Sequence, residues 1–209
     1  MSRISCAPGR HEITGVILAG GRGRRMGGVD KGLESLAGVA LVDHVMARLQ
    51  GQVNDIIISA NRHCTEYSRR GVTVVSDEQK GYQGPLMGIQ AGLKTSPTRW
   101  VLLVPCDTPV LPLDLVARLA AGIGKADIAV AHDGERNHPV VALLHRGLVD
   151  SLKQALARGE RKVTTWFATH KVMEVDFSDC PDAFINLNSL DQCQALEARL
   201  NETHYRERG

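Results

Sequence analysis

The chain has 209 residues, enough for one domain with a full hydrophobic core. Hydrophobic residues make up 43% and charged residues 23% of it, as in ordinary globular proteins, and the net charge of +2 is too small to favour nucleic acid or an anionic membrane as a partner. The five cysteines form no CxxC pair and no zinc-like spacing with histidine, and the N-terminus lacks a signal-peptide core, so we expect a cytoplasmic protein without a membrane span.

Short apolar runs alternate along the chain with amphipathic segments. Six runs have the length and composition of buried strands: residues 15–19, 55–60, 72–75, 100–104, 126–131 and 140–144. Five other segments have the apolar spacing of helices: residues 39–49, 87–93, 113–121, 148–157 and 190–200. Asp133 and Gly134 predict a turn between the last two strands.

This alternation predicts an α/β fold. Continuous apolar strands need cover on both faces, so we expect three layers, with a mainly parallel, twisted, Rossmann-like sheet between helices. One domain accounts for residues 15–201, preceded by an N-terminal extension at 1–14 and followed by a C-terminal tail at 202–209.

Polar residues or glycines follow four of the predicted strands. Gly20 and Gly21 follow the first, Asn61 the second, Asp77 the third and Asp107 the fourth. The carboxyl ends of parallel strands meet at one edge of a sheet, where ligands bind. These residues therefore predict a site at that edge.

The glycine-rich segment after the first strand suits a polyphosphate. Its backbone N–H groups can approach an anion closely, and it carries four cationic side chains: Arg22, Arg24, Arg25 and Lys31. From the glycines alone, a turn with a solvated basic face is an equal alternative.

Three familiar phosphate-binding loops do not fit this segment. A Walker A loop needs Gly-Lys followed by Ser or Thr, whereas Lys31 lies between Asp30 and Gly32. A dinucleotide fingerprint starting at Gly21 needs Gly or Ala where Met26 stands. A kinase glycine loop needs HRD and DFG motifs, which do not follow.

The complete pattern is more specific than its glycines. It resembles the signature of the molybdenum cofactor guanylyltransferases, or MobA family, in the nucleotide-sugar-transferase-like superfamily. The matching motifs run in order over roughly residues 15–198: Leu18-Ala19-Gly20-Gly21, Arg25-Met26-Gly27, Asp30-Lys31, Ala60-Asn61-Arg62, Asp77, Gly84-Pro85-Leu86-Met87-Gly88-Ile89, Pro105-Cys106-Asp107-Thr108-Pro109, His132-Asp133-Gly134-Glu135-Arg136, His138-Pro139 and Phe184-Ile185-Asn186-Leu187-Asn188.

The resemblance implies a nucleotidyltransferase that moves GMP from GTP to molybdenum-molybdopterin, releasing pyrophosphate and using Mg²⁺. It also implies contacts with cofactor-insertion proteins and recipient molybdoenzymes. Two alternatives stay open: a molybdopterin cytidylyltransferase or sugar-phosphate nucleotidyltransferase, and a non-catalytic nucleotide-binding carrier. Lys31 and Asp107 together argue against the carrier, because binding alone does not require that pair.

The resemblance also implies roles for the nucleotide-site residues. Residues 18–21 (Leu18, Ala19, Gly20 and Gly21) and Asn61 belong to the nucleotide site, and Asp77 contacts guanine or ribose. Arg25 and Lys31 face the triphosphate. The family pattern of Asn-x-Asn at the second strand end is broken by Ser59, so no nucleotide contact is carried over there.

Each charged group has a structural alternative. Asp107 is the candidate Mg²⁺ ligand, because a hard carboxylate oxygen suits that ion, but an aspartate at this point also suits a helix N-cap. The structural alternative for Lys31 is a surface ion pair with Asp30, and the alternative for Asp77 is a plain turn residue.

Three residues are candidates for the acceptor side, by resemblance: His138, Asn186 and Asn188. On a strand the two asparagines would share a face; Asn188 or Ser189 could instead cap the next helix, and His138 could simply make a structural hydrogen bond. Cys106 has no His partner in sequence and is expected to be a small buried residue rather than a nucleophile. Residues 158–170 could contact the acceptor, but an ordinary amphipathic helix is the favoured interpretation.

Overall fold

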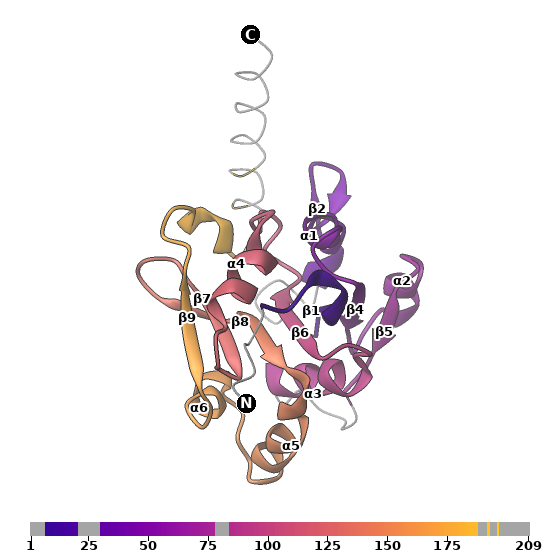
Figure 1. Cartoon of the computed structure of the whole chain (residues 1–209). Helices are drawn as coiled ribbons and strands as arrows, with labels where there is room; N and C mark the ends of the chain where they lie inside the picture. The colour runs from indigo at the N-terminus through magenta and orange to yellow at the C-terminus, as the bar shows by residue number, and fades with distance from the viewer. Residues whose placement is uncertain (1–6, 21–29, 78–83, 188–191, 193–195, 197–209) are drawn as a thin grey trace.

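The computed structural model describes residues 7–20, 30–77, 84–187, 192 and 196. Its centre is a seven-stranded sheet in the order β5-β4-β1-β6-β8-β7-β9 (Figure 1). Only β8 is antiparallel to its neighbours, so the predicted mainly parallel α/β fold is confirmed. The strands are β1 (Ile13–Leu18), β4 (Asp55–Ser59), β5 (Thr73–Val75), β6 (Trp100–Pro105), β7 (Ile128–His132), β8 (Asn137–His145) and β9 (Val172–Asp176).

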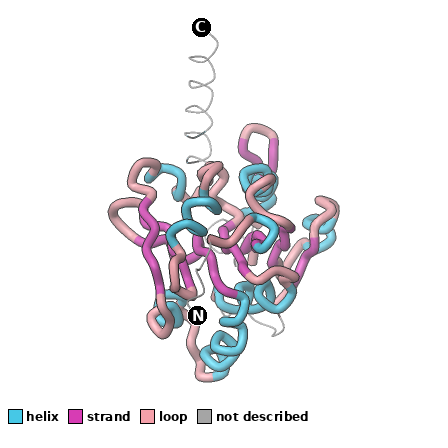
Figure 2. The backbone as a smooth tube through the Cα atoms, viewed as in Figure 1, coloured by secondary structure: helices cyan, strands magenta, loops and turns pink. Residues whose placement is uncertain are grey.

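Helices cover both faces of the sheet, so the sheet is the middle layer, as Figure 2 shows. Alternate strand residues point to opposite faces: Ile17 packs in the cluster formed with α1 and α4, and Val16 in the cluster formed with α3, α5 and α6. The helices are α1 (Leu41–Leu49), α2 (Cys64–Ser68), α3 (Pro85–Thr95), α4 (Leu115–Gly122), α5 (Val149–Ala157) and α6 (Val163–Phe167).

The structure changes some predicted boundaries. Strand β1 begins at Ile13, two residues earlier than expected. The helix predicted at 39–49 was wrong at its start, because β3 (Val39–Ala40) pairs with β2 (Ser35–Leu36) in a hairpin and the helix begins at Leu41. Positive φ angles of 51° at Ala37 and 81° at Gly38 close that tight turn.

Besides the β2–β3 hairpin, strand β9 and helix α2 were missed. Strand β9 carries charged residues among its apolar ones, so its apolar run is weak, and it forms as a partner of β7. Helix α2 is only five residues long, too short for a periodic signal. The helix predicted at 190–200 lies, except for residues 192 and 196, outside the described part of the chain.

Two glycines let α3 lie close against the sheet. A Cβ at Gly92 would lie 2.7 Å from Val16 Cγ1, and one at Gly88 would lie 2.7 Å from Ser59 Oγ. The first turns of α3 are thereby held against the ends of β1 and β4. Among the helices that the structure describes, none has the length and apolar character needed to cross a membrane.

Candidate active site

The ends of four neighbouring parallel strands meet, as predicted. Backbone hydrogen bonds continue the pairing just beyond them: Ala19 N–H donates to Ser59 O at 2.8 Å, Ala60 N–H to Val75 O at 2.9 Å, and Cys106 N–H to Leu18 O at 3.2 Å. The segments that follow β1, β4, β5 and β6 therefore start from one edge of the sheet.

Lys31 and Asp107 form an ion pair at this edge. The Lys31 Nζ to Asp107 Oδ2 distance is 3.2 Å, and Asp107 is 8% exposed. The alternative pairing of Lys31 with Asp30 is wrong. Asp107 is also no cap of the following helix, because α4 begins at Leu115 with Asp114 at the N-cap position.

Asp30 is turned inward, an arrangement that the sequence analysis missed. Its Oδ1 accepts a hydrogen bond of 2.7 Å from the Tyr67 hydroxyl, and its Oδ2 lies 3.0 Å from His63 Nδ1. Burial, and then the hydrogen bond to Asp30, raises the pKa of Tyr67. Tyr67 is the fourth residue of the five-residue helix α2, and nothing in so short a segment would have revealed its distant partner.

Asn61 and Asp77 bind each other. Asn61 Nδ2 donates to Asp77 Oδ2 at 2.7 Å, and the Asp77 backbone N–H donates to Asn61 Oδ1 at 2.8 Å. Asp77 Oδ1 is buried and has no hydrogen-bond partner among the described residues. Burial raises the pKa of Asp77 and outweighs the lowering by Asn61. A buried acceptor without a donor is suited to receive one from a ligand.

Ser59 faces α3. It is 2% exposed, and its hydroxyl lies where a Cβ on Gly88 would have to stand. Ser59 thus lies between the end of β4 and α3 and is shielded from solvent.

His138 has structural partners on both sides. Its Nε2 lies 2.7 Å from Asp133 Oδ2, and its ring stacks on Phe184 with 4.8 Å between the centroids. The backbone N–H groups of Arg136 and Glu135 are the main cause of the lowered pKa of Asp133. The predicted turn at Asp133 and Gly134 is confirmed, with a φ of 97° at Gly134.

The segment that carries Asn186 lies beside Asp107. Leu187 N–H donates to the backbone oxygen of Asp107 at 2.9 Å, and Thr108 Oγ1 donates to Asn186 Oδ1 at 3.1 Å. The strand geometry suggested for Asn186 was wrong: a 3-10 helix (Pro181–Phe184) precedes it and residues 185–187 form no strand. Of the other predicted site residues, Gly21, Arg25 and Asn188 lie outside the described residues.

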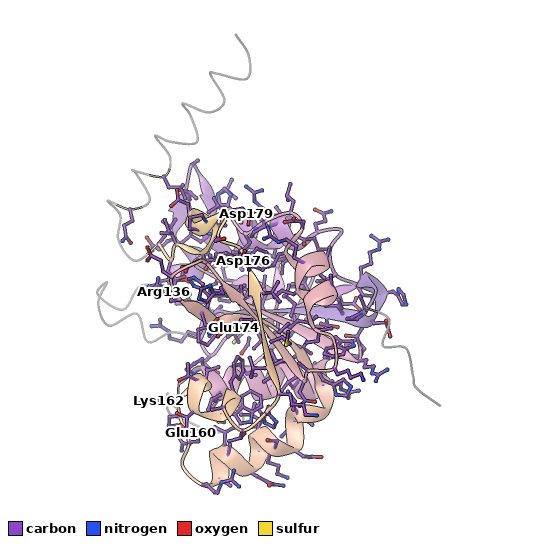
Figure 3. The ribbon with its side chains drawn as sticks, turned by 60° about the vertical axis from the view of Figure 1, so that its left-hand side comes forward. Arg136, Glu160, Lys162, Glu174, Asp176 and Asp179 are labelled. Carbon is purple, nitrogen blue, oxygen red and sulfur yellow. The ribbon has the colours of Figure 1, made fainter. Side chains whose placement is uncertain are left out.

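Cys106 is 7% exposed, and burial raises its thiol pKa, so the interpretation as a small buried residue holds. Residues 158–162 form a turn in which Glu160 accepts the backbone N–H groups of Arg161 and Lys162, both at 2.7 Å. Figure 3 shows Glu160 and Lys162 together, apart from Asp176 and Asp179. The favoured helix is confirmed only over α6, where Trp166 is buried.

Comparison with known proteins identifies the family. Residues 15–173 match the family described as the MobA-like NTP transferase domain. The chain belongs to this family. As a MobA-like NTP transferase it is an enzyme, and the predicted nucleotidyltransferase class is confirmed.

Relatives of similar length carry a more specific name. The chain is 47% identical over 194 residues to the molybdenum cofactor guanylyltransferase of Shewanella sp. strain MR-4, covering 92% of this chain and 98% of that protein. It is 48% identical over 187 residues to the protein of the same name from Shewanella sediminis, covering 88% and 95%.

Solved structures share the fold. Molybdopterin-guanine dinucleotide biosynthesis protein A from Archaeoglobus fulgidus has a TM-score of 0.75 at 20% identity, with 90% of this chain and 99% of that chain covered. The 4-diphosphocytidyl-2C-methyl-D-erythritol synthase from Anaerococcus prevotii has a TM-score of 0.73 at 12% identity, with 96% and 100% covered. The name of the second refers to a cytidyl product, so this fold alone does not select the base.

Proposed function

We propose that this MobA-like NTP transferase moves GMP from GTP to molybdenum-molybdopterin, forming the molybdopterin guanine dinucleotide cofactor and releasing pyrophosphate. Relatives at 47% identity over 98% of their length carry the guanylyltransferase name. The observation that carries the chemistry is the Lys31–Asp107 ion pair of 3.2 Å, which joins the end of the glycine-rich segment to the end of β6.

The proposed reaction balances without a general base. A terminal phosphate oxygen of molybdopterin attacks the α-phosphorus of GTP, a new P–O bond forms, and the bond between the α-phosphorus and the bridging oxygen to the β-phosphate breaks. The nucleophile is already anionic, so no hydroxyl proton has to be removed. The enzyme's task is to align two polyanions and to stabilise charge on the leaving pyrophosphate. Lys31 and Arg25 are the residues assigned to that charge.

Asp107 fits a magnesium ligand. Its carboxylate is largely buried at the end of β6, and the described residues contain no group of three His, Cys, Asp or Glu side chains that could hold a metal. Mg²⁺ commonly takes one or two protein carboxylates and completes its shell with phosphate and water oxygens. Bound at Asp107, the ion would neutralise phosphate charge and polarise the P–O bonds.

We assign guanine or ribose recognition to Asp77, with Asn61 as its support. Asp77 Oδ1 is a buried acceptor that no described residue satisfies, and guanine offers N1–H and amino donors. Asn61 holds the carboxylate by two mutual hydrogen bonds. Residues 18–20 at the end of β1 complete the nucleotide side.

For the acceptor we propose the segment beside Asp107 that carries Asn186, where Thr108 Oγ1 donates to Asn186 Oδ1 at 3.1 Å. Asn188 belongs to the same proposal by its sequence position. His138 is better explained as a support for Phe184 than as a direct contact, because its imidazole already binds Asp133 and stacks on that ring. The proposal includes transfer of the product to cofactor-insertion proteins and recipient molybdoenzymes.

The test is pyrophosphate release by Asp107→Ala and by the wild type. At saturating Mg²⁺ and GTP with molybdenum-molybdopterin, turnover of the variant should fall by at least about 100-fold, because charge on the leaving group loses its stabilisation. Asp150→Ala is the matched control, since Asp150 is exposed on α5. Thermal unfolding should show both variants folded, and near-normal turnover of Asp107→Ala would contradict the metal assignment.

The same assay separates the functions. We expect release with GTP that depends on the acceptor, and much less with CTP or ATP. Preference for CTP would point to the cytidylyltransferase alternative, and nucleotide binding without release under any condition would point to a carrier.

A further inference from the structure

Asp30 has a buried carboxylate and is the first residue that the structure describes after the glycine-rich segment. The 3-10 helix Lys31–Leu33 begins at once after it, with Leu33 N–H donating to Asp30 O at 3.0 Å. Asp30 is 7% exposed, and both of its carboxylate oxygens have partners from α2 or the residue before it. Burying a polar group at this depth is costly unless it has such hydrogen-bond partners.

The backbone is tightly confined here. A Cβ at Gly32 would lie 2.4 Å from the Tyr67 hydroxyl oxygen and 3.4 Å from Cys106 Cβ. Residue 32 therefore fits between α2 and the end of β6 only without a side chain. Lys31 lies between this contact and Asp30, so the placement of Tyr67 constrains the backbone on both sides of Lys31.

We propose that Tyr67 is a positioning residue for the transfer reaction: through Asp30 it fixes the backbone of Lys31, so that the Lys31 ammonium group stays opposite Asp107. His63 supports the same carboxylate from the surface. The inference rests on the proposed role of Lys31 in the reaction and extends it to residues that touch neither substrate.

The contacts account for this role step by step. The Tyr67 ring is fully buried in the apolar cluster that includes residues of α1, so the position of its hydroxyl is fixed by packing. The hydroxyl donates to Asp30 at 2.7 Å, and Asp30 begins the turn that presents Lys31. Loss of that donor leaves a buried carboxylate oxygen short of a hydrogen bond, which favours a shift of the turn. A shift of about 1 Å in a reacting site can cost on the order of 100-fold in rate.

The test begins with Tyr67→Phe, which removes one oxygen and keeps the buried ring. Loss of a supporting hydrogen bond behind a functional group typically costs about 10–100-fold. We expect kcat for pyrophosphate release to fall by about 10-fold while KM for GTP changes by less than about 3-fold, because Lys31 acts on charge that develops in the transition state. Ser68→Ala is the matched control: it removes a hydroxyl from the exposed side of α2 and should leave both constants unchanged.

A double-mutant cycle separates positioning from general damage to the fold. If Tyr67 acts through Lys31, then Tyr67→Phe should change kcat little when it is added to Lys31→Ala. His63→Ala gives a second route, because His63 is at the surface, with its side chain 51% exposed, and the variant should fold. It should lower kcat by a smaller factor, also only when Lys31 is present. Asp30→Asn, whose amide oxygen still accepts from Tyr67, should keep more activity than Asp30→Ala.

The kcat values of these variants separate the positioning role of Tyr67 from the role of Lys31 itself. If Lys31→Ala is impaired and Tyr67→Phe has wild-type kcat, or if their effects multiply in the double variant, the positioning role is wrong and the proposed function stands. If Lys31→Ala has wild-type turnover, the role of Lys31 fails and the inference fails with it. If Tyr67→Phe does not fold, the same test is made with His63→Ala, alone and combined with Lys31→Ala.

Discussion

At the scale of single residues, Asp77 and Asp133 show how the surroundings of a carboxyl group raise or lower its pKa. Asp77 lies partly buried beside one amide, and burial raises its pKa. Asp133 receives backbone N–H groups from Arg136 and Glu135, which lower its pKa. Desolvation disfavours the charged form and donors favour it. The fold therefore places at Asp77 a carboxylate that gains from a ligand able to donate hydrogen bonds.

We predict that Asp77→Asn changes stability in a pH-dependent way. The pKa of Asp77 is raised on folding, so the stability contributed by its proton is fully present below the ordinary aspartate value of about 3.9 and is lost as pH rises through the raised value. The Tm of the variant minus that of the wild type should grow over that interval and then level off. GTP affinity should fall, because guanine loses a charged acceptor.

For the control variant, Asp176→Asn, we expect the Tm difference to change with pH in the opposite direction. The backbone N–H of Ser178 lowers the pKa of the exposed Asp176, so the wild-type carboxylate stabilises the fold above the ordinary pKa and loses that effect as pH falls. The Tm of Asp176→Asn minus that of the wild type should therefore decrease as pH rises. A Tm difference for Asp77→Asn that does not vary with pH would contradict its raised pKa.

At the scale of helices and strands, α3 shows how two glycines allow a helix to pack closely against the sheet. Gly88 and Gly92, one turn apart, remove the atoms that would hold the helix away from β4 and β1. Glycine costs about 1 kcal/mol against alanine inside a helix, so the close approach must offset that loss. Its result is that Gly88, in the first turn of α3, lies against Ser59 and Leu18, the last residues of β4 and β1.

We predict that Gly92→Ala destabilises the protein by roughly 1 kcal/mol. The new Cβ would stand 2.7 Å from Val16 Cγ1, and overpacking of this kind costs about 1–3 kcal/mol, which offsets the gain of about 1 kcal/mol in helix propensity. Urea unfolding measures the change. Thr95→Ala, at an exposed position of the same helix, gains propensity without a clash and should not destabilise.

The predicted clash between residues 92 and 16 can also be tested in a double variant. Val16→Ala removes the two methyl groups in the way, so Gly92→Ala should cost less in that background than in the wild type. Equal costs in both backgrounds would show that Val16 is not the obstacle.

The two large apolar clusters share the same sheet, so we expect the whole molecule to unfold as one cooperative unit. Strands β1, β4, β6, β7 and β8 contribute alternate residues to each side. Both clusters therefore contribute to the stability of the same strands. The single reversed strand, β8, pairs with β6, the last of the four adjacent parallel strands, and with β7 in the hairpin that carries Asp133 and His138.

We predict that Leu103→Ala lowers the free energy of unfolding by about 2–5 kcal/mol, since Leu103 is fully buried in the middle of β6. Urea unfolding should still show a single transition with an unchanged m-value, and kcat should be retained where the variant is folded. Leu113→Ala is the matched control, because Leu113 is 69% exposed and should change stability by less than about 0.5 kcal/mol. Two separate transitions would contradict the cooperative unit.

The sequence by itself determined the layers and the edge of the sheet at which we propose the site. Apolar runs such as residues 100–104 predicted strands, and Asn61, Asp77 and Asp107 do follow β4, β5 and β6, three of the four adjacent parallel strands. This worked because burial on both faces leaves a local signal in each strand. The nucleotide class came from the family resemblance, which the glycine-rich segment alone would not have supplied.

Only the tertiary structure decided which groups meet. Lys31 pairs with Asp107, 76 positions away, rather than with its neighbour Asp30, and Asp30 binds Tyr67, 37 positions away. Strand order and close helix packing fix such pairs, and periodicity in a single sequence carries no information about either. The same reason explains why β9 and the β2–β3 hairpin were missed: each forms because of the partner it pairs with and has no strong apolar pattern of its own.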